Sequence, residues 1–552
     1  MTKSRDTADI NSGTNTAVGE DALENNTASN NTAVGYQAGY SNTTGNKNVT
    51  LGGVSGYDNT TGRLNTFVGY NSGANNTTAD SNTFMGESAG FTNTTGQYNT
   101  AIGQSALVFN TTASENTAVG YKALYANTTG DGNTAIGVKA MDANTVGDRN
   151  VAVGSDALGS MNPSSNTDMY NTAVGYQAGL AVSTGIQNTL IGGLAGDALT
   201  TGSLTAVGYS AGGSATTSIG NVFMGELSGA SVTTGNNNTA VGSQALTTLN
   251  TSSGNSAFGH DALRYVTGDG NVALGYNAGV WATTTDHCVF IGYEAGGNAT
   301  VTGHDNVFVG MRAGQNITSG DGNVSMGRSA FGNASTASGN TAVGGKAGEG
   351  VTTAGSNVLL GYKAGAYGVN LTTGSNNTIL GSYAYTTASN TNSAQIIGHN
   401  VAGATGYTTL GYANHDIRAA NGSTTWSTVS DERYKKDIVD STAGLSFVNA
   451  LQPRTFKYKN LGELPETFSA YKADSTEVFK SSQTQHGFIA QEVKAAIDAD
   501  DSIKDGFKLW DDRDDGSQEV AESALIPVLV KAIQELSAKN DALEARIATL
   551  EG

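Results

Sequence analysis

The stretch Asn31-Thr32-Ala33-Val34-Gly35 decides the fold, because the chain repeats it with small changes over most of its length. It recurs unchanged at 116–120 and 171–175, among other places. Each copy is followed by a few residues that end in Ala-Gly or Ala-Leu, and then by a polar turn of Asn, Thr and Gly. The glycines of successive copies lie about 17 residues apart, which gives about two dozen units. Longer gaps before Gly175 and Gly381 predict loop insertions.

This period predicts a β-solenoid. A unit of about 17 residues is too short for a helical hairpin or a propeller blade, but it suits one coil of a solenoid. The glycine after each strand can supply a left-handed or tightly packed corner. Asn and Thr in the turns can bond neighbouring backbone, or their equivalents one coil along. Residues 12–412 are therefore expected to be mainly β and to form a β-solenoid or β-roll.

Two adjacent positions of each strand are apolar, and adjacent strand residues point to opposite faces. The residue directly before the glycine, as in Val34, Met85 and Ile102, is expected to form one continuous buried ladder. The residue before that one, as in Ala33 and Phe67, is apolar as well. One face can fill the interior of the coil, and the other must be covered. Second and third copies of the chain are the simplest cover, so the pattern predicts a homotrimer.

Over residues 12–412 the repeat resembles the head domains of trimeric bacterial adhesins, whose Asn-Ser/Thr-x-x-x-Gly motifs build a parallel β-roll. The resemblance implies a left-handed roll made of three chains.

A tyrosine often follows the repeat glycine and forms a third column. Aromatic rings combine a large apolar area with a polar tip, so this column could stack on the sugar rings of a receptor. Packing at the corners of the coil is the alternative. The column comprises Tyr36, Tyr70, Tyr121, Tyr176, Tyr209, Tyr276, Tyr293, Tyr362 and Tyr412.

Charge divides the chain near residue 412. Residues 1–412 contain 23 acidic and 12 basic side chains, whereas the much shorter stretch 413–552 contains 24 and 16. Such a shift marks a boundary between two architectures. We expect an N-terminal attachment segment over 1–11, the shaft over 12–412, a connector over 413–429 and a small α+β domain over 430–552.

Composition excludes several classes of protein. The net charge of −19 argues against a nucleic-acid partner. No stretch approaches the roughly 18 consecutive apolar residues of a membrane-spanning helix, so no membrane insertion is expected. The first residues lack the apolar core of a secretory signal peptide. The lone Cys288 permits no disulfide within the chain, and we expect neither a cofactor nor a bound metal.

A serine and a lysine five positions apart lie at the boundary, within Val429-Ser430-Asp431-Glu432-Arg433-Tyr434-Lys435. Three further blocks follow, at 453–458, 486–493 and 525–536. Taken in this order, the blocks resemble the self-cleaving intramolecular chaperones at the ends of phage tail spikes and fibres, first recognised on endosialidases. The resemblance covers about residues 426–552.

In that family a serine attacks the peptide bond directly before itself, assisted by a lysine. Carried over by position, Ser430 is the nucleophile, Lys435 the base, and Val429–Ser430 the cleaved bond. Lysine acts as a base only when burial or nearby positive charge lowers its pKa. Arg433 and Lys436 could provide that charge, and packing in the trimer could provide the burial.

Asp431 and Glu492 are candidate orienting groups for this dyad. The competing interpretation is that Ser430 and Asp431 cap a turn while Lys435 is solvated. His486 is an alternative base, although a core or hydrogen-bonded histidine is the favoured interpretation.

Residues 528–551 are expected to form a helix with an apolar seam of heptad spacing, which predicts a coiled coil. Packing of this helix on its own domain is the alternative. The seam comprises Leu529, Ile533, Leu536, Asn540, Leu543, Ile547 and Leu550.

Together these features predict a phage tail fibre or tailspike, made in the host cytoplasm and carried on the virion. It would bind other virion tail proteins through its N-terminus and a host cell-surface glycan or protein receptor through its shaft. Its C-terminal domain would trimerise and fold the solenoid and then release itself by autoproteolysis. The alternatives are a bacterial trimeric surface adhesin and a polysaccharide-degrading tailspike. The second needs paired carboxylates around a sugar bond, and the shaft shows no conspicuous acidic cluster.

Overall fold

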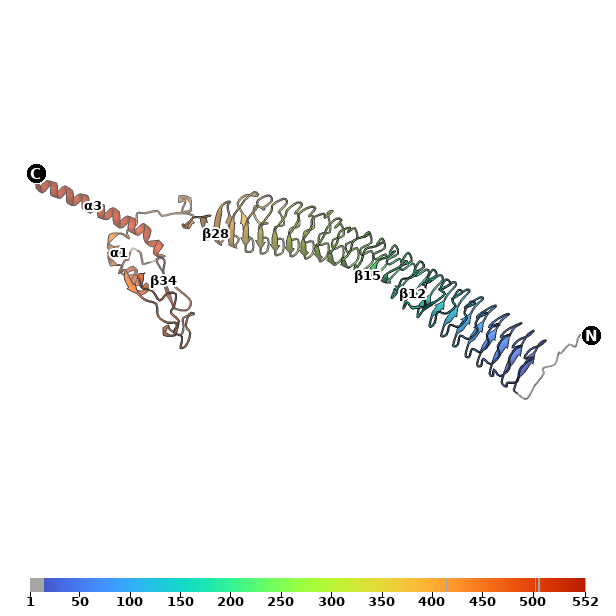
Figure 1. Cartoon of the computed structure of the whole chain (residues 1–552). Helices are drawn as coiled ribbons and strands as arrows, with labels where there is room; N and C mark the ends of the chain where they lie inside the picture. Colours follow the sequence, from blue (N-terminus) through green and yellow to red (C-terminus); the bar gives the residue numbers. More distant parts are fainter. Residues whose placement is uncertain (1–13, 414, 502, 505–506, 552) are drawn as a thin grey trace, which may run out of the picture. The chain divides into compact units, whose positions relative to one another are not determined.

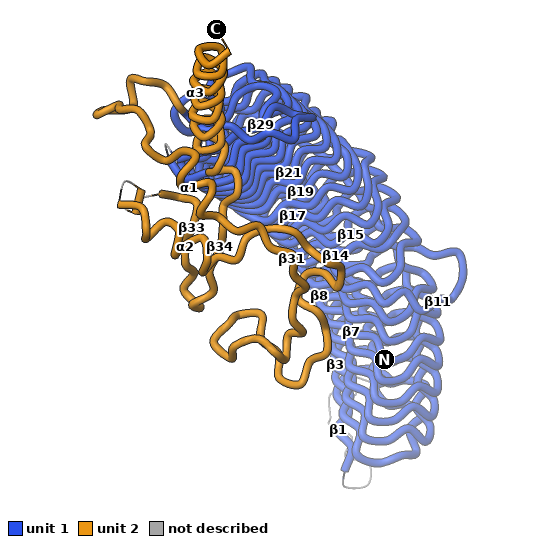
Figure 2. Tube along the Cα trace, turned by 90° about the vertical axis from the view of Figure 1, so that its left-hand side faces the viewer, with its two compact units in different colours: residues 1–429 blue, residues 430–552 orange. Residues whose placement is uncertain are grey.

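The computed structural model describes residues 14–413, 415–501, 503–504 and 507–551. The chain forms two compact units, Met1–Val429 and Ser430–Gly552, which Figure 2 shows in different colours. The attachment segment expected over residues 1–11 lies outside the described residues.

The first unit is a β-solenoid, in which each coil adds one short strand to a single long sheet (Figure 1). Successive strands pair in parallel and in register, so that Thr66 lies beside Thr83 and Phe67 beside Phe84. The predicted β-solenoid with coils of about 17 residues is therefore confirmed. Most strands have three residues, because the chain must turn again directly after each repeat glycine.

The stacked parallel strands are β1 (Thr16–Val18), β2 (Thr32–Val34), β3 (Val49–Leu51), β4 (Thr66–Val68), β5 (Thr83–Met85), β6 (Thr100–Ile102), β7 (Thr117–Val119), β8 (Thr134–Ile136), β10 (Val151–Val153), β12 (Thr172–Val174), β13 (Thr189–Ile191), β14 (Ser203–Val207), β15 (Ile219–Met224), β16 (Thr239–Val241), β17 (Ser256–Phe258), β18 (Val272–Leu274), β19 (Val289–Ile291), β20 (Val307–Val309), β21 (Val324–Met326), β22 (Thr341–Val343), β23 (Val358–Leu360), β24 (Thr378–Leu380), β26 (Gln395–His399) and β28 (Tyr407–Tyr412).

The middle residue of each strand fills the interior of the coil. Ala33 and Phe67 are fully buried, and the rings of Phe67 and Phe84 stack with centroids 5.2 Å apart. By contrast, Val34 is 39% exposed and Met85 is 40% exposed. The prediction that the residue before the glycine forms the buried ladder is therefore wrong for the single chain. Strand alternation turns that column outward, and its neighbour on the N-terminal side turns inward.

The repeat glycines are required by the close approach of successive coils. Gly120 has a φ of +132°, and a Cβ added to it would lie 2.4 Å from the carbonyl oxygen of Gly137 in the next coil. A side chain at this position would collide with backbone, which cannot give way. The expected role of these glycines as tight corners is confirmed.

Buried asparagines link each coil to the next. The backbone N–H of Asn116 donates to Asn99 Oδ1 at 3.0 Å, and that of Asn133 donates to Asn116 Oδ1 at 2.9 Å. Threonines on the turn do the same from their hydroxyls, as Thr94 Oγ1 does to the carbonyl of Thr111 at 2.9 Å. Hydrogen bonding of turn residues to their equivalents one coil along is thus confirmed.

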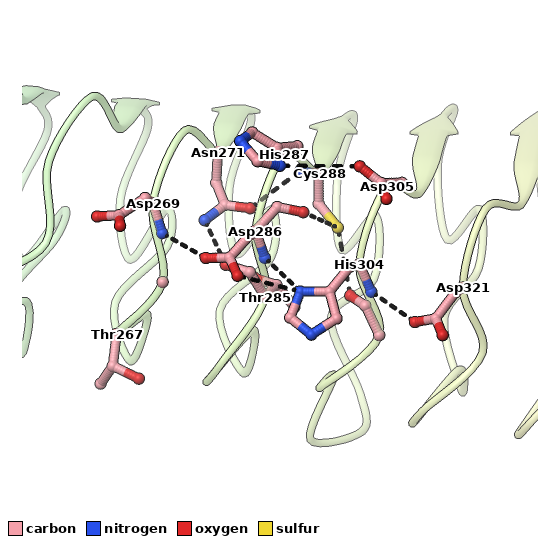
Figure 3. A network of polar contacts seen from close by, with 12 residues as sticks. Thr267, Asp269, Asn271, Thr285, Asp286, His287, Cys288, His304, Asp305 and Asp321 are labelled. Atoms are coloured by element: carbon pink, nitrogen blue, oxygen red, sulfur yellow. Dashed lines mark hydrogen bonds and ion pairs between the residues drawn. The ribbon is translucent and has the colours of Figure 1, made fainter.

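A further polar ladder runs along the solenoid and is drawn in Figure 3 for coils 269–321. The backbone N–H of Asp269 donates to Asp286 Oδ1 at 2.8 Å, that of Asp286 to His304 Nδ1 at 3.1 Å, and that of His304 to Asp321 Oδ1 at 2.8 Å. In this region Cys288 occupies a position that asparagine holds in most coils. Burial raises the pKa of its thiol to about 11, so the thiol is protonated and unreactive at neutral pH.

Both predicted loop insertions are present. In the first, β11 (Thr167–Asp168) pairs in parallel with β9 (Gly147–Asp148) of the preceding coil. In the second, Val369 forms an isolated bridge with Thr386. The small pair β25 (Tyr385–Thr386) and β27 (Ala402–Gly403) follows.

The sheet continues past the residue where the repeat stops. Strand β29 (His415–Ala420) pairs antiparallel with β28, and β30 (Ser427–Thr428) pairs antiparallel with β29. These two strands take up about half of the segment 413–429, which was expected to be a connector. The physical reason is that the last coil presents unpaired backbone N–H and C=O groups, which a returning strand satisfies.

The second unit is a small α+β domain, as predicted. Its core contains Phe447, Val493, Ile497, Leu509 and Leu525. In the described residues no helix is both long and apolar enough to cross a membrane. The elements are η1 (Glu432–Tyr434), α1 (Leu445–Ala450), β31 (Arg454–Phe456), η2 (Leu461–Glu463), β32 (Gln485–Gly487), α2 (Ala490–Asp498), β33 (Trp510–Asp512), β34 (Gln518–Val520), η3 (Glu522–Leu525) and α3 (Ile526–Glu551).

Replacing a repeat glycine is expected to damage the shaft far more than replacing a glycine on an open turn. Gly120→Ala places a Cβ against backbone, whereas Gly322, also at positive φ, has nothing within 4 Å of its added Cβ. Gly322→Ala should cost about 1–2 kcal/mol from the left-handed backbone alone, and Gly120→Ala clearly more. Thermal unfolding of the two variants measures the difference, and equal losses would contradict the proposed close contact.

Candidate functional site

A short turn at the start of the second unit brings Ser430 and Lys435 together. Residues Glu432–Tyr434 form the 3-10 helix η1, and Asp431 is its N-terminal cap. The Asp431 carboxylate accepts the backbone N–H of Arg433 at 2.9 Å, while its carbonyl accepts that of Tyr434 at 3.1 Å. The turn reverses the chain, so the side chains at its two ends meet.

The amine of Lys435 donates a hydrogen bond to Ser430 Oγ, with Nζ and Oγ 2.8 Å apart. This is the distance of a direct hydrogen bond, and a base that takes a proton from a serine hydroxyl must lie this close. The bond between Val429 and Ser430 is also the boundary between the two compact units. The structure thus brings together the two residues that the sequence nominates as nucleophile and base.

The other charges near the dyad are largely paired. Arg433 donates two hydrogen bonds to the Asp431 carboxylate, at 2.6 Å from a terminal guanidinium nitrogen to Oδ2 and at 2.9 Å from Nε to Oδ1. These hydrogen bonds hold the pKa of the Asp431 carboxyl below its ordinary value. Asp431 therefore serves the turn and Arg433, and it partly neutralises the positive charge that Arg433 was expected to offer Lys435. Lys436 is exposed, and no ion pair involves it in the described part of the chain.

Glu492, on α2, is engaged elsewhere. Its two carboxylate oxygens accept from Arg454 Nε at 2.9 Å and from the terminal nitrogen of Arg454 at 2.8 Å. The guanidinium holds the pKa of Glu492 below its ordinary value. Within the described residues Glu492 makes no hydrogen bond or ion pair with Ser430 or Lys435. The structure therefore does not bring this candidate orienting group to the dyad.

His486, the alternative base, lies on β32 with its Nδ1 3.3 Å from the hydroxyl of Thr455 on β31. It takes part in the short antiparallel pair that this strand forms. This arrangement is the simple structural role considered above, a histidine held by a hydrogen bond.

Ser430, Lys435 and Val429 are all exposed in the single chain. A lysine that is to act as a base needs burial or uncompensated positive charge. The single chain therefore supplies the contact between the two groups, but it does not supply the burial. The residues around the dyad leave it exposed, so burial of the dyad requires packing against other residues.

Two contacts in this unit were not predicted from the sequence. Arg454 pairs with Glu492 across 38 residues, and Glu535 on α3 accepts the backbone N–H of Leu445 at the start of α1, at 2.9 Å. Both depend on how separate elements pack, so no local sequence pattern announces them. The second contact ties the long helix to the domain that carries the dyad.

Helix α3 has two apolar faces with different surroundings. Val528 and Ala532 are buried against the domain. The predicted heptad seam faces away: Ile533 is 66% exposed, and Leu543 is 57% exposed. Among the residues that the structure describes, the seam does not pack on its own domain, which was the alternative considered above, and these side chains are exposed.

Breaking the Glu492–Arg454 pair is expected to weaken the C-terminal unit and to leave cleavage unchanged. Folding lowers the pKa of Glu492, so the ion pair stabilises the folded unit at every pH above the ordinary pKa of a glutamate side chain. This stabilisation is lost as the pH falls through the lower pKa that Glu492 has in the folded protein. In a Ser430→Ala background, Glu492→Gln should therefore lower the urea midpoint at neutral pH but not in strong acid. Glu466→Gln, at an exposed site with no ion pair in the described residues, is the control. Loss of cleavage in Glu492→Gln with Ser430 intact would instead show that Glu492 acts on the dyad.

Comparison with known proteins bears on this unit. Residues 430–501 match a family whose description is chaperone of endosialidase. No curated protein and no solved structure matches the chain. The match begins at Ser430 and includes Lys435, so the second unit is similar to an endosialidase-type chaperone domain over the stretch that holds the dyad. Such a domain directly after a β-solenoid indicates a tailspike- or fibre-like protein.

Proposed function

We propose that this protein is the shaft of a phage tail fibre or tailspike, made as a trimer with the help of its own C-terminal domain. Residues 430–552 gather three chains, guide the winding of the solenoids and then detach by cutting the bond between Val429 and Ser430. The observation that carries the proposal is the 2.8 Å contact between Lys435 Nζ and Ser430 Oγ at the first residue of the matched segment.

The proposed reaction starts when neutral Lys435 takes the hydroxyl proton of Ser430 and Oγ attacks the carbonyl carbon of Val429. Backbone N–H groups stabilise the oxyanion that forms. As the C–N bond breaks, Lys435 returns the proton to the nitrogen of Ser430, and the acyl group remains as an ester on Oγ. Water hydrolyses the ester, leaving a carboxylate on Val429 and a free amine and hydroxyl on Ser430.

Trimer formation would act as the timer of this reaction. In the single chain the dyad is formed but exposed, so Lys435 lacks the burial that a lysine base requires. Packing of three chains around residues 430–435 would remove water from the dyad. Cleavage would therefore follow assembly, and loss of the chaperone would make the assembled shaft kinetically irreversible.

The exposed seam of α3 supplies the means of gathering three chains. A heptad seam left open to water is stabilised by packing against equivalent helices. The seam includes Asn540, a polar residue of the kind that sets register and the number of helices. A parallel clamp at this end would bring three shafts into register.

The shaft itself needs such help. All its strand pairs in the parallel stack join successive coils, so a misregistered start leaves open strand edges that can pair wrongly. The outward column that includes Val34 and Met85 is apolar and exposed, and neighbouring shafts in the trimer would cover it. Virion tail proteins would bind the N-terminus, and the shaft would bind a glycan or protein receptor on the host.

A bacterial surface adhesin remains the second candidate, on the resemblance of the repeat alone. It accounts for residues 12–412 and gives no role to the chaperone-like segment. We therefore favour the tail fibre or tailspike.

Intact mass spectrometry of the purified protein tests the cleavage. The wild type should yield a fragment made of residues 430–552, and the fragment should be absent from Ser430→Ala and Lys435→Met, which remove the nucleophile and the base. Ser427→Ala, three residues upstream on the exposed strand β30, should cleave like the wild type. A full-length wild-type mass in fully assembled trimers would refute autoproteolysis.

Substitution in the α3 seam tests the role of the trimer. Leu543→Glu places a charge in the predicted three-helix interface and should abolish trimers, because even the loss of one buried leucine costs about 2–5 kcal/mol and three are lost at once. Cleavage should then fail too, since the dyad stays exposed. Ala538→Glu, on the opposite exposed face of the helix, is the matched control and should behave as wild type. Multi-angle light scattering gives the oligomeric state, and efficient cleavage of a monomeric Leu543→Glu protein would contradict the timer.

A further inference from the structure

Aromatic side chains gather on the last coils of the solenoid; the coils themselves lead up to β28 in Figure 1. Tyr367 is central: its ring lies 4.8 Å from that of Tyr383 and 5.8 Å from that of Tyr385, in both cases edge to face. Tyr362 meets Tyr383 at 5.3 Å, again edge to face. In each of these pairs the edge of one ring lies over the face of the other, a preferred arrangement of aromatic side chains.

The cluster continues across two further coils. The ring of Tyr383 lies 5.7 Å from that of His399, and His399 stacks on Tyr412 at 5.3 Å. Tyr412 ends the row and is 64% exposed, while Tyr362 and Tyr367 are each 39% exposed. We name this surface the tyrosine cluster; it comprises Tyr362, Tyr367, Tyr383, Tyr385, His399 and Tyr412.

An insertion that coil stacking does not need builds the centre of this cluster. Tyr367 lies in the long coil between Gly361 and Gly381, one of the two places where the repeat lengthens. Other coils stack through the same glycine and asparagine contacts without these extra residues. The insertion therefore adds a half-exposed aromatic ring to the shaft, and this ring lies against Tyr383 and Tyr385 of the next coil.

The choice of tyrosine also separates the cluster from the packing of the shaft. Where the solenoid buries aromatic rings it uses phenylalanine, as at Phe223, Phe290 and Phe308. The outward column that three chains would share is mostly aliphatic. Hydroxyl-bearing, half-exposed rings suit a partner that has both apolar C–H faces and hydroxyl groups, which describes a sugar ring.

The distribution of charged residues along the chain favours an acidic sugar over a neutral one. The chain carries 47 acidic residues and a net charge of −19, yet residues 350–415 contain neither Asp nor Glu. Lys363 is the one lysine or arginine in that stretch, and its Nζ lies 5.8 Å from the ring centroid of Tyr362 and 6.0 Å from that of Tyr367. An acidic polymer would be repelled by most of this protein and least by these coils.

We propose that the tyrosine cluster binds an acidic saccharide, with sugar rings stacked on the tyrosines and a sugar carboxylate near Lys363. The inference rests on the proposed role of the shaft in attachment. It assigns that role to coils 361–412, the last coils before the boundary at Val429. Loss of residues 430–552 would leave these coils near the new end of the chain.

A glycan array of acidic and neutral bacterial polysaccharides, with alginate and dextran as reference chains, tests the site on the intact protein. The wild type should bind at least one acidic glycan. Tyr367→Ala and Tyr412→Ala should each weaken that binding about tenfold, since each removes one aromatic ring on which a sugar would stack. Lys363→Ala should weaken it less, and more at low than at high salt.

Tyr70→Ala is the matched control, because Tyr70 holds the same position after a repeat glycine, is 58% exposed and lies far along the solenoid. Tyr412 is exposed enough that its loss should leave folding intact, which thermal unfolding of each variant verifies. Binding that Tyr367→Ala and Tyr412→Ala both retain, or binding of neutral glycans alone, would overturn the site but not the attachment role. A wild type that binds no glycan overturns the site as well, whereas failure of the proposed function shows separately as loss of cleavage and of trimer formation.

Discussion

The dependence of every coil on the next one governs this structure. The backbone of one coil donates to the backbone and the asparagines of its neighbour, and the repeat glycines let the two approach within contact of a carbonyl oxygen. No coil can satisfy its own polar groups, so a single unit has no stable form, and stability accumulates only as coils stack. The same dependence explains the antiparallel return of β29, because the last coil has no successor to accept its hydrogen bonds.

Because each coil depends on the next, correct folding requires that the first coils pair in the right register. A shaft with many nearly identical coils offers many wrong registers, and each wrong register exposes strand edges. A separate domain that gathers chains at one end removes most of these alternatives. The second unit has the parts for this work: a long helix with one face in the domain core and an open heptad seam on the other, joined to α1 through Glu535. The Ser430–Lys435 pair at the start of this unit is formed but exposed, and under the proposed function it would link release of the domain to packing that a single chain does not provide.

Prediction from the sequence succeeded where the signal repeats. About two dozen copies of one motif give the solenoid, the corner glycines and the asparagine contacts, and two gaps in the spacing give the insertions. The sequence did not show which of the two apolar columns faces the interior, because both look alike. The column containing Val34 was predicted to be buried, but Ala33 and Phe67 of the other column fill the interior of the coil. The closing hairpin within residues 413–429 was not predicted, because a single hairpin has no repeat to reveal it. At the site, spacing and resemblance nominated Ser430 and Lys435, but Glu492 turned out to bind Arg454, a residue 38 positions away.

The sequence alone thus determined the period of the shaft, the break near residue 412 and the pair of residues at the boundary, since each is written in local spacing or composition. Tertiary structure alone decided which side of each strand is buried, how the end of the sheet is closed, and which carboxylate meets which guanidinium. These outcomes depend on the rotation of each strand about its axis and on the packing of elements distant in the chain. The tyrosine cluster belongs to the second kind, because stacking of coils brings together six rings that the sequence spreads over residues 362–412.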